Sequence, residues 1–536
     1  MKWRYRFAGI GEIVSAVRRP RVNAPLLLLL CGIGLFHYLT MPNFLYHGDN
    51  FAPRAECAYW LSTGQWGIPY TMKPMLGDLC NERGQYFFEN DAKQRMFSKY
   101  GFGYTLFYIP PLLAEKIRSG YLDILSKTRS QLFFLNVYQV LLTILIAAYL
   151  YKIISFYAQR TWVRVSFVLA SFYTTFFWHY LRSPTTEIYH ILTFLGFYYH
   201  MLRFLRGCES SEQRDSATWR HLGYATAYAG YSVLIKHSFS VLLGAAWLFA
   251  GLAGPLGVPL LKRIRLNSTR YLVRNLLYTG LPSLLFVGAF IAVNLYRCGD
   301  PLETGYGQWV SETTHQPIAN LSWRNIPDAA KGFLYRSANS NANVFIHYPL
   351  FVFALFGYGR FLRRTPLDGA FLLFVVGTHF LVVLCFSSWN GEWCYGPRLV
   401  LHPLIIASLP VIETGRAVWE SRKNLVRSMA VATAVLVLGG SLMLQYYMNS
   451  LPYFTYYDVS ALFARSKQES VRKYFDTHWH RGILHRDLMR YLDGKAPYYP
   501  LEEVKKMYPP QDHAMLETRV HDALNQIARP NYYFFP

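Results

Sequence analysis

The sequence is dominated by apolar blocks of about 15–22 residues that are separated by short segments rich in Lys and Arg. Each block is close to the roughly 20 residues that cross a bilayer as a helix. Only 16% of the 536 residues are charged, against roughly 25% in an average soluble domain, and 52% are apolar. The sequence therefore predicts an all-α polytopic membrane protein and excludes a single soluble enzyme.

We predict about eleven membrane-spanning helices, with the N-terminus in the cytoplasm and the C-terminus outside. The first span runs from Ala24 to about Tyr46 and follows six Lys or Arg residues and a single acid, which the positive-inside rule places in the cytoplasm. A cleavable signal peptide is not expected, because the apolar stretch is too long and lacks a small-residue cleavage site. The other predicted spans are 131–151, 165–180, 188–201, 221–235, 238–254, 275–296, 344–359, 367–386, 400–413 and 428–447.

The apolar stretch from His221 to Gly254 is divided into two spans at Lys236 and His237. As one helix its 34 residues would extend about 51 Å, which is too long for a bilayer core of about 30 Å. The division also returns the chain to the cytoplasm before the basic segment 262–274. The predicted cytoplasmic segments then hold 25 Lys or Arg residues and five acids, which accounts for most of the formal net charge of +23. The charge follows from the topology, so we do not expect nucleic acid as a partner.

Three regions outside the membrane complete the predicted organisation. The first external loop, 47–129, contains the apolar segment Tyr104–Leu113, which we interpret as a surface helix because Pro110 and Pro111 interrupt the helical ladder. A second external loop covers 297–343, and the polar composition of the last segment predicts a small external C-terminal domain. The predicted divisions are a cytoplasmic N-terminus at 1–23, a transmembrane module at 24–447 and the external domain at 448–536.

Two acids lie where predicted spans meet the outer surface. Asp49 directly follows the first span and is a candidate general base at the bilayer surface, with helix capping as the alternative. Glu187 begins the fourth span, where an acid can serve in catalysis or simply stabilise the helix dipole. Both interpretations stay open for both residues.

Three cations on the same side are candidates for binding an anion. Lys99 stands in the turn Ser98–Gly103, whose glycines allow close backbone approach to a ligand. Lys236 lies in the break between two spans, and Arg398 ends the aromatic segment Trp389–Arg398. Aromatic rings stack on sugar faces and a guanidinium forks onto phosphate oxygens, so this segment suits a sugar carried on a lipid phosphate. The alternative for Lys236 and Arg398 is that they snorkel to the membrane surface.

Metal, redox and nucleotide motifs are absent from the sequence. The seven cysteines have no CxxC or CxxH spacing, and no phosphate-binding GxxxxGK[ST] sequence occurs. Cys57 and Cys80 share the first external loop, and Cys298 and Cys394 face outward, so disulfides can form in an oxidising compartment, but no pairing follows from the sequence. A zinc site or an internal ATPase is therefore not indicated.

Several of these segments together resemble the GT-C superfamily of membrane glycosyltransferases, which includes protein mannosyltransferases, aminoarabinose transferases and arabinosyltransferases. The resemblance covers the chain from Asp49 to about Pro410. It rests on the acid after the first span, the Lys-Tyr-Gly-Phe-Gly turn at 99–103, the pair Arg182 and Glu187, the segment Asp300–Gly307 and the segment Trp389–Arg398.

The resemblance implies a GT-C-like bundle that moves a sugar from a polyprenyl-phosphate carrier to an acceptor hydroxyl. It implies an inverting single displacement with Asp49 as base and Glu187 as an assisting or metal-holding acid, on the external face of a bacterial inner membrane. Asn50 stands where the family often has a second acid, so a divalent metal cofactor is not indicated.

The partners that the resemblance implies are the lipid-linked sugar, membrane lipid and an acceptor protein, glycolipid or polysaccharide. The implied donor-phosphate ligands are Lys99, Lys236 and Arg398. The implied sugar or lipid contacts are Tyr100, Tyr306, Trp389, Glu392, Trp393 and Tyr395. Two other classes compete with this interpretation: a transporter or flippase of a lipid-linked glycan, and a non-catalytic membrane scaffold.

Overall fold

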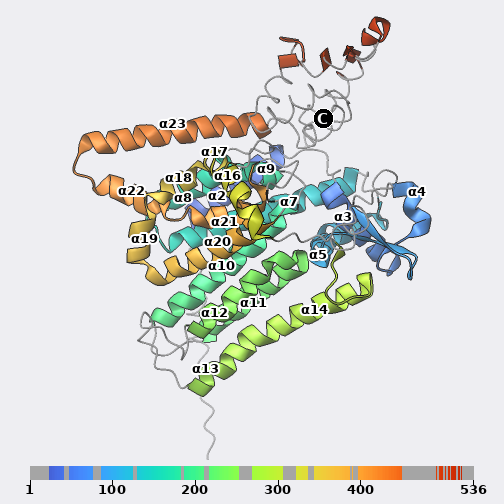
Figure 1. Cartoon of the computed structure of the whole chain (residues 1–536), viewed down its shortest axis with the longest axis horizontal. Helices are drawn as coiled ribbons and strands as arrows, with labels where there is room; N and C mark the ends of the chain where they lie inside the picture. The colour runs from blue at the N-terminus through green and yellow to red at the C-terminus, as the bar shows by residue number, and fades with distance from the viewer. Residues whose placement is uncertain are drawn as a thin grey trace, which may run out of the picture.

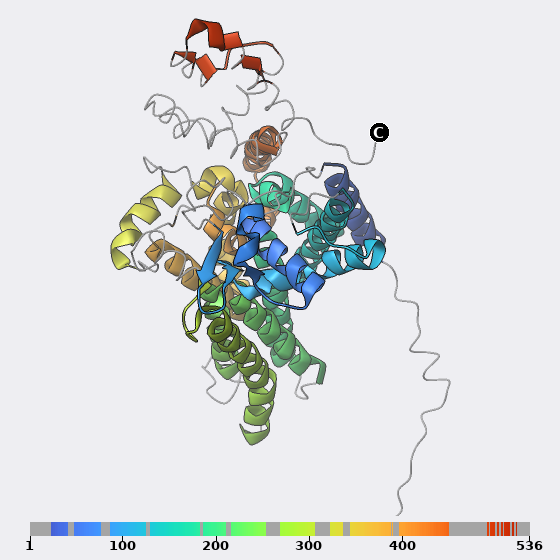
Figure 2. The ribbon, with the colours of Figure 1, turned by 90° about the vertical axis from the view of Figure 1, so that its right-hand side faces the viewer.

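The computed structural model is a bundle of helices with one small sheet beside it (Figure 1). It describes residues 23–40, 48–76, 86–124, 129–182, 186–210, 216–252, 268–305, 322–335, 343–386, 389 and 396–449, together with short pieces between 490 and 521. The pieces between 490 and 521 lie apart from the bundle in both views (Figures 1 and 2).

The longest helices agree with predicted spans. Several of them, α10, α11, α12 and α14, run side by side (Figure 1). Figure 1 also shows α23 along one edge of the bundle. The bounds of the long helices are α2 (Ala24–Thr40), α7 (Arg129–Ser155), α10 (Glu187–Ser210), α11 (Ser216–Ile235), α12 (Ser240–Leu252), α14 (Leu281–Cys298), α20 (Pro366–Cys385) and α23 (Asn424–Asn449).

Other predicted spans are broken into shorter helices. The span at 165–180 is interrupted where Thr174 and Thr175 bond back to the carbonyls of Ala170 and Ser171 at 2.8 and 2.6 Å, which competes with the helical ladder. The shorter helices are α8 (Thr161–Tyr173), α9 (Phe177–Arg182), α13 (Ser268–Asn275), the π-helix η5 (Leu276–Gly280), α17 (Val344–His347), α18 (Pro349–Leu355), α19 (Tyr358–Arg364), η7 (Arg398–Val400), α21 (Leu401–Ala407) and α22 (Val411–Glu420). Of these, α13 and η5 continue into α14, and η7 continues through α21 into α22, so 271–298 and 398–420 each act as one long helix.

The predicted break at Lys236 is confirmed. Lys236 has the extended backbone angles φ −152° and ψ 123°, which end α11, and a single 3₁₀ turn, η3 (His237–Phe239), leads into α12. The two helices then pack along each other. Because the chain reverses at Lys236, both far ends of this hairpin lie on one side of the bundle.

The membrane character of the protein is supported by five of the described helices, which are long and apolar enough to cross a bilayer: 130–155, 271–298, 366–385, 398–420 and 424–446. The two nearly unburied ones, 271–298 and 424–446, present their side chains to the surroundings. This pattern is expected where lipid covers a helix. The count of eleven spans stays a prediction.

A three-stranded antiparallel sheet lies in the segment predicted as the first external loop, and the sequence did not predict it. Its order is β1-β3-β2, with β1 at Ile68–Pro69, β2 at Phe87–Asn90 and β3 at Arg95–Ser98. Phe88 pairs with Phe97 across β2 and β3, and the two rings stack at 5.8 Å. The expectation that this loop holds only helices is therefore incomplete. Figure 2 faces this sheet, which lies in front of the bundle.

Helices of the same loop surround the sheet and join it to the bundle. They are α3 (Gly48–Thr63), the 3₁₀ turn η1 (Tyr70–Met72), α4 (Lys73–Leu76), α5 (Phe102–Phe107) and α6 (Ile109–Ser119). The predicted surface helix is thus two helices, and Pro110 and Pro111 lie in the first turn of α6, where proline is tolerated, and do not interrupt a helix. Ile117 of α6 is 78% exposed, as expected for a helix at a membrane surface.

The opposite end of the bundle is held by ion pairs. Arg206 of α10 reaches Asp368 of α20 at 2.6 Å, and Tyr157 donates to the same carboxylate at 3.0 Å. Arg364, which ends α19, reaches Glu413 of α22 at 3.0 Å. Both acids are buried, so these contacts hold α10, α20 and the α19–α22 pair together at the predicted cytoplasmic side.

The predicted topology gives a labelling experiment. A cysteine introduced at Ser268, the first residue of α13, should not react with a membrane-impermeant thiol reagent added outside cells, whereas a cysteine at Ala496 should react. The reason is the strong bias of basic residues toward segments such as 262–274. Both variants are made in a background without native cysteines and are compared before and after permeabilisation. External labelling of the Ser268→Cys protein would overturn the topology.

Candidate functional site

A buried ion pair lies where α10 and η7 begin. Nε of Arg398 donates to Oε1 of Glu187, and the two side chains are 15% and 7% exposed. The second carboxylate oxygen, Oε2 of Glu187, is buried without a hydrogen-bond partner. Arg398 therefore orients a carboxylate that keeps one oxygen available for a ligand. A buried acceptor of this kind is costly unless a ligand or water satisfies it.

Lys236 belongs to the same group of side chains. Both Lys236 and Arg398 interact electrostatically with His190 of α10, which lies one helical turn after Glu187. Glu187 and Arg398 thus pair although they are far apart along the chain, and Lys236 is linked to this pair through His190, with which both cations interact electrostatically. Two cations and an oriented carboxylate at one end of a membrane bundle form a site suited to an anionic ligand with hydroxyl groups.

Three histidines lie beside this ion pair: His190 of α10, His379 of α20 and His402 of α21. Nε2 of His379 and Nε2 of His402 are 2.7 Å apart, and the rings of His190 and His402 are 6.1 Å apart. Tyr104 of α5 contacts Nε2 of His190 through its hydroxyl. Sequence reasoning missed these histidines. A usable signal was present, because each is an ionisable residue inside an apolar span, and such residues are rare unless they have a function.

The turn that carries Lys99 packs directly on the Lys236 break. A Cβ atom on Gly101 would lie 2.2 Å from the carbonyl oxygen of Ile235, and one on Gly103 would lie 2.8 Å from the nitrogen of Ile235. The prediction that these glycines allow close approach to a ligand is wrong in this respect, because the backbone they approach is the end of α11.

Lys99 and Tyr100 are both buried in this turn. The ammonium of Lys99 lies over the rings of Tyr86 and Tyr100 at 5.2 and 5.4 Å, and Tyr100 stands edge-on to Tyr104 at 5.9 Å. Lys99 is therefore held by aromatic rings, while Tyr100 connects through Tyr104 to His190. The contacts thus lead from Lys99 through Tyr100 and Tyr104 to His190, so Tyr100 is one step closer to the ion-pair site than Lys99.

Trp389 anchors the aromatic segment to a helix of the second external loop, α16 (Ile326–Leu334). Its ring is 4% exposed and packs on Gly332, and its Nε1 donates to Asp328 at 3.1 Å. This packing favours a positioning role for Trp389. The other predicted sugar or lipid contacts, Tyr306, Glu392, Trp393 and Tyr395, lie outside the described residues.

Asp49 lies in the first turn of α3, and the structure describes its backbone but not its side chain. An acid at this position also favours the helix dipole, so the capping alternative stays open. Further along α3, Arg54 interacts electrostatically with Tyr108, whose ring stands 5.8 Å from that of Tyr189 in the first turn of α10. Tyr108, between α5 and α6, thus links α3 to the start of α10, where Glu187 lies.

A second buried charged group, in the first external loop, has a structural role. Thr105 donates to Oε2 of Glu56 at 3.3 Å, and Arg297 donates to the carbonyl of Tyr100 at 3.1 Å. Burial raises the pKa of the Glu56 carboxyl above its ordinary value, although the nearby Arg297 opposes this shift. Glu56 joins α3 to α5 and so helps to fix the external loop on the bundle.

The raised pKa of Glu56 gives a stability prediction. A carboxyl whose pKa is higher in the folded state contributes stability below its unfolded pKa, and this contribution is lost as pH rises through the folded pKa. The Glu56→Gln protein should therefore be at least as thermostable as wild type at pH 7.5, and its relative advantage should shrink at pH 4.5. The opposite order, with Glu56→Gln much less stable at pH 7.5, would show that the ionised carboxylate stabilises the fold.

Metal and disulfide chemistry find no further support in the described part of the chain. No set of three or more His, Cys, Asp or Glu residues there is arranged to hold a metal ion. Cys57 and Cys298 are thiols, and Cys80 and Cys394 lie outside the described residues.

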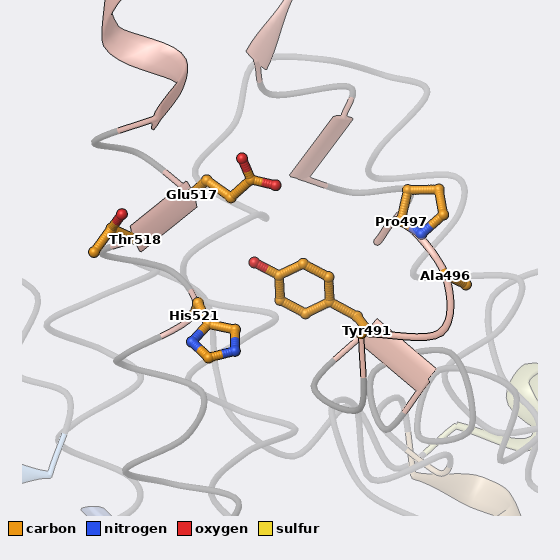
Figure 3. Close-up of a pocket in the computed structure, with 7 residues that line it drawn as sticks. Tyr491, Ala496, Pro497, Glu517, Thr518 and His521 are labelled. Atoms are coloured by element: carbon orange, nitrogen blue, oxygen red, sulfur yellow. The ribbon is translucent and has the colours of Figure 1, made fainter.

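A pocket in the C-terminal region is shown in Figure 3. The ring of Tyr491 points between Glu517 and His521, with the ring centroids of Tyr491 and His521 5.8 Å apart. Glu517 is paired with Lys505 at 3.3 Å, and burial raises the pKa of the Tyr491 hydroxyl. These side chains pair with one another, which is typical of a structural cluster.

Comparison with known proteins identifies the fold. No protein-family model matches the sequence, and no curated protein sequence matches it. The structure is similar to the oligosaccharyltransferase AglB of the archaeon Archaeoglobus fulgidus, solved with an inhibitory peptide and a dolichol-phosphate, with a TM-score of 0.52 at 12% identity over 84% of this chain. The apo form of the Archaeoglobus fulgidus oligosaccharyltransferase matches with a TM-score of 0.50 at 13% identity over 86% of this chain.

At 12–13% identity this likeness shows the fold alone: the chain shares the fold of these membrane oligosaccharyltransferases, in agreement with the all-α membrane architecture that the sequence predicts. The matched regions cover 59% and 60% of those two chains, so this chain corresponds to somewhat more than half of their length.

Proposed function

We propose that this protein is a membrane glycosyltransferase that moves a sugar from a polyprenyl-phosphate carrier to an acceptor hydroxyl. The observation that carries the proposal is the buried Glu187–Arg398 pair in a bundle with the AglB fold, with Lys236 linked electrostatically to the adjoining His190. In the protein interior, charged side chains interact with a phosphate more strongly than in water. The dolichol-phosphate in the AglB structure supports a lipid phosphate as the donor class.

The proposed reaction is an inverting single displacement. Asp49 removes the proton of the acceptor hydroxyl while that oxygen attacks the anomeric carbon, and the bond between this carbon and the phosphate oxygen breaks. Lys236 and Arg398 stabilise the negative charge that grows on the departing lipid phosphate. The unpaired Oε2 of Glu187 accepts a hydrogen bond from a hydroxyl and so orients the substrate. Protein, glycolipid and polysaccharide are the acceptor classes that we propose.

The ion pairs at the opposite end of the bundle disfavour a flippase. Arg206–Asp368 and Arg364–Glu413 join helices there with buried acids, whereas alternating access requires that end to open. The sequence also predicts the candidate residues at one face of the membrane module, whereas a transporter is expected to have polar or broken helices near the midplane.

Reconstituted vesicles separate the two functions. Purified protein supplied with a polyprenyl-phosphate-linked radiolabelled sugar and a mixed acceptor extract should move the label to the acceptor and release the polyprenyl phosphate. Movement of intact donor across the bilayer without transfer would show a flippase and reject the proposal.

A further inference from the structure

The histidine layer, which we define as His190, His379 and His402, has no part in the reaction proposed above. His190 follows Glu187 by one turn of α10, and His402 follows Arg398 by about one turn through η7 into α21. His190 and His402 therefore each lie one helical turn after an ion-pair residue, Glu187 and Arg398 respectively. The three rings are 3–7% exposed.

Two polar contacts connect the layer to helices outside the ion pair. The 2.7 Å contact between Nε2 of His402 and Nε2 of His379 joins α21 to α20. The contact of His190 with Tyr104 joins α10 to α5. Because these groups are buried, a helix that rotated away would leave a polar atom without a partner, which is unfavourable. The two contacts therefore fix how α10 and α21 are each rotated about their own axes.

The layer also contacts the Lys236 break. Phe239, the last residue of η3, lies three residues after Lys236 and touches all three histidine rings, with centroid distances of 4.8 Å to His190, 4.9 Å to His402 and 5.3 Å to His379. Each polar member of the site thus lies three or four residues before a ring of this cluster: Glu187 before His190, Lys236 before Phe239 and Arg398 before His402.

We propose that the histidine layer is a positioning layer for the donor-phosphate site. In this role the His379–His402 hydrogen bond fixes the direction of Arg398, the Tyr104–His190 contact fixes Glu187, and Phe239 seats the Lys236 break. The inference rests on the proposed function, because it assigns the layer to the binding of the donor. The histidines act through Arg398, Glu187 and Lys236 and need not touch the substrate.

The protein offers a matched control near the middle of α10, more than three turns after Glu187. His200 of α10 and His221 of α11 form a histidine pair with Nδ1 atoms 2.8 Å apart, and neither residue contacts the ion-pair site in the described structure. Loss of this pair removes the same kind of hydrogen bond from the same bundle.

The test measures donor affinity and unfolding temperature in nanodiscs, with a synthetic polyprenyl-phosphate sugar as the probe. His379→Leu should weaken probe binding roughly tenfold, His379→Gln should restore part of it because an amide can bond to His402, and His200→Leu should leave it unchanged. In the Arg398→Ala background, His379→Leu should have little further effect, because the histidine acts through Arg398. His402→Gln gives the same comparison if His379→Leu does not fold.

Three results would overturn the inference. One is unchanged affinity in His379→Leu; another is the same loss in His200→Leu. The third is that His379→Leu lowers donor affinity by the same factor in the wild-type and the Arg398→Ala backgrounds, which would mean that the layer only stabilises the bundle. Failure of the wild-type protein to bind the probe would instead reject the proposed function, and the inference with it.

Discussion

Replacement of Asp49 by Asn should lower the rate of sugar transfer by about 10²–10⁴-fold while donor binding persists. Asparagine keeps the shape of the side chain and most of its hydrogen bonds, but it cannot take the proton of the acceptor hydroxyl. The measurement is single-turnover transfer from a labelled polyprenyl-phosphate sugar, with donor affinity determined on the same preparation. Asp91→Asn is a suitable control, because Asp91 is an external acid whose carboxylate accepts from Tyr70 at 2.9 Å in an exposed turn.

The Glu187→Gln protein separates the roles of the two acids. It should lose less activity than Asp49→Asn if Glu187 only orients a hydroxyl, and a comparable amount if it shares the base function. Near-normal transfer by Asp49→Asn together with an inactive Glu187→Gln would exchange the two roles. Normal transfer by both variants would show that these acids are helix caps and anchors.

Removal of the Arg398 side chain should weaken donor binding about 10- to 150-fold, because a charge-assisted contact to phosphate is worth about 1.5–3 kcal/mol. Lys236→Ala should weaken it by a similar factor, and Arg398→Lys should be intermediate, since lysine keeps the charge but loses the fork. Donor affinity is measured by displacement of a fluorescent polyprenyl phosphate in nanodiscs.

The ion pair with Glu187 requires a control for folding. Arg398→Ala alone leaves a buried carboxylate without its cation, which can destabilise the protein. The double variant Arg398→Ala/Glu187→Gln removes that unpaired charge and should recover the thermal stability without recovering donor affinity. Unchanged donor affinity in both Arg398→Ala and Lys236→Ala would reject the phosphate site.

The sequence predicted the bundle because the length of apolar blocks and the position of basic loops depend on the bilayer alone. The break at Lys236 is an example, since a helix of 34 residues does not fit the membrane core and the chain had to reverse. The sheet in the first external loop was missed because strands of two to four residues, such as Phe87–Asn90, give too short an alternation to recognise.

The sequence predicted Glu187, Lys236 and Arg398 on one face because each lies next to the end of a predicted span, and in the structure Glu187 pairs with Arg398. The contact between Glu187 and Arg398 depends on the packing of α10 against η7, which no local pattern encodes. The histidine layer was missed although each histidine lies inside a predicted apolar span, because the pairing of His379 with His402 depends on how α20 and α21 pack. The sequence predicted that the glycines of the Lys99 turn allow close backbone approach, which is what they do. The neighbour that approaches them is the end of α11 and not a ligand.

The most direct test of a lipid-phosphate donor is native mass spectrometry of the protein purified from its own membranes. Wild-type protein should carry a lipid whose fragmentation gives a polyprenyl phosphate and a sugar, and the Arg398→Ala/Glu187→Gln protein should carry much less of it. Supply of purified acceptor should convert the bound lipid to the free polyprenyl phosphate in wild type but not in Asp49→Asn. Recovery of ordinary phospholipid alone, even after incubation with synthetic polyprenyl-phosphate sugars, would contradict the proposal.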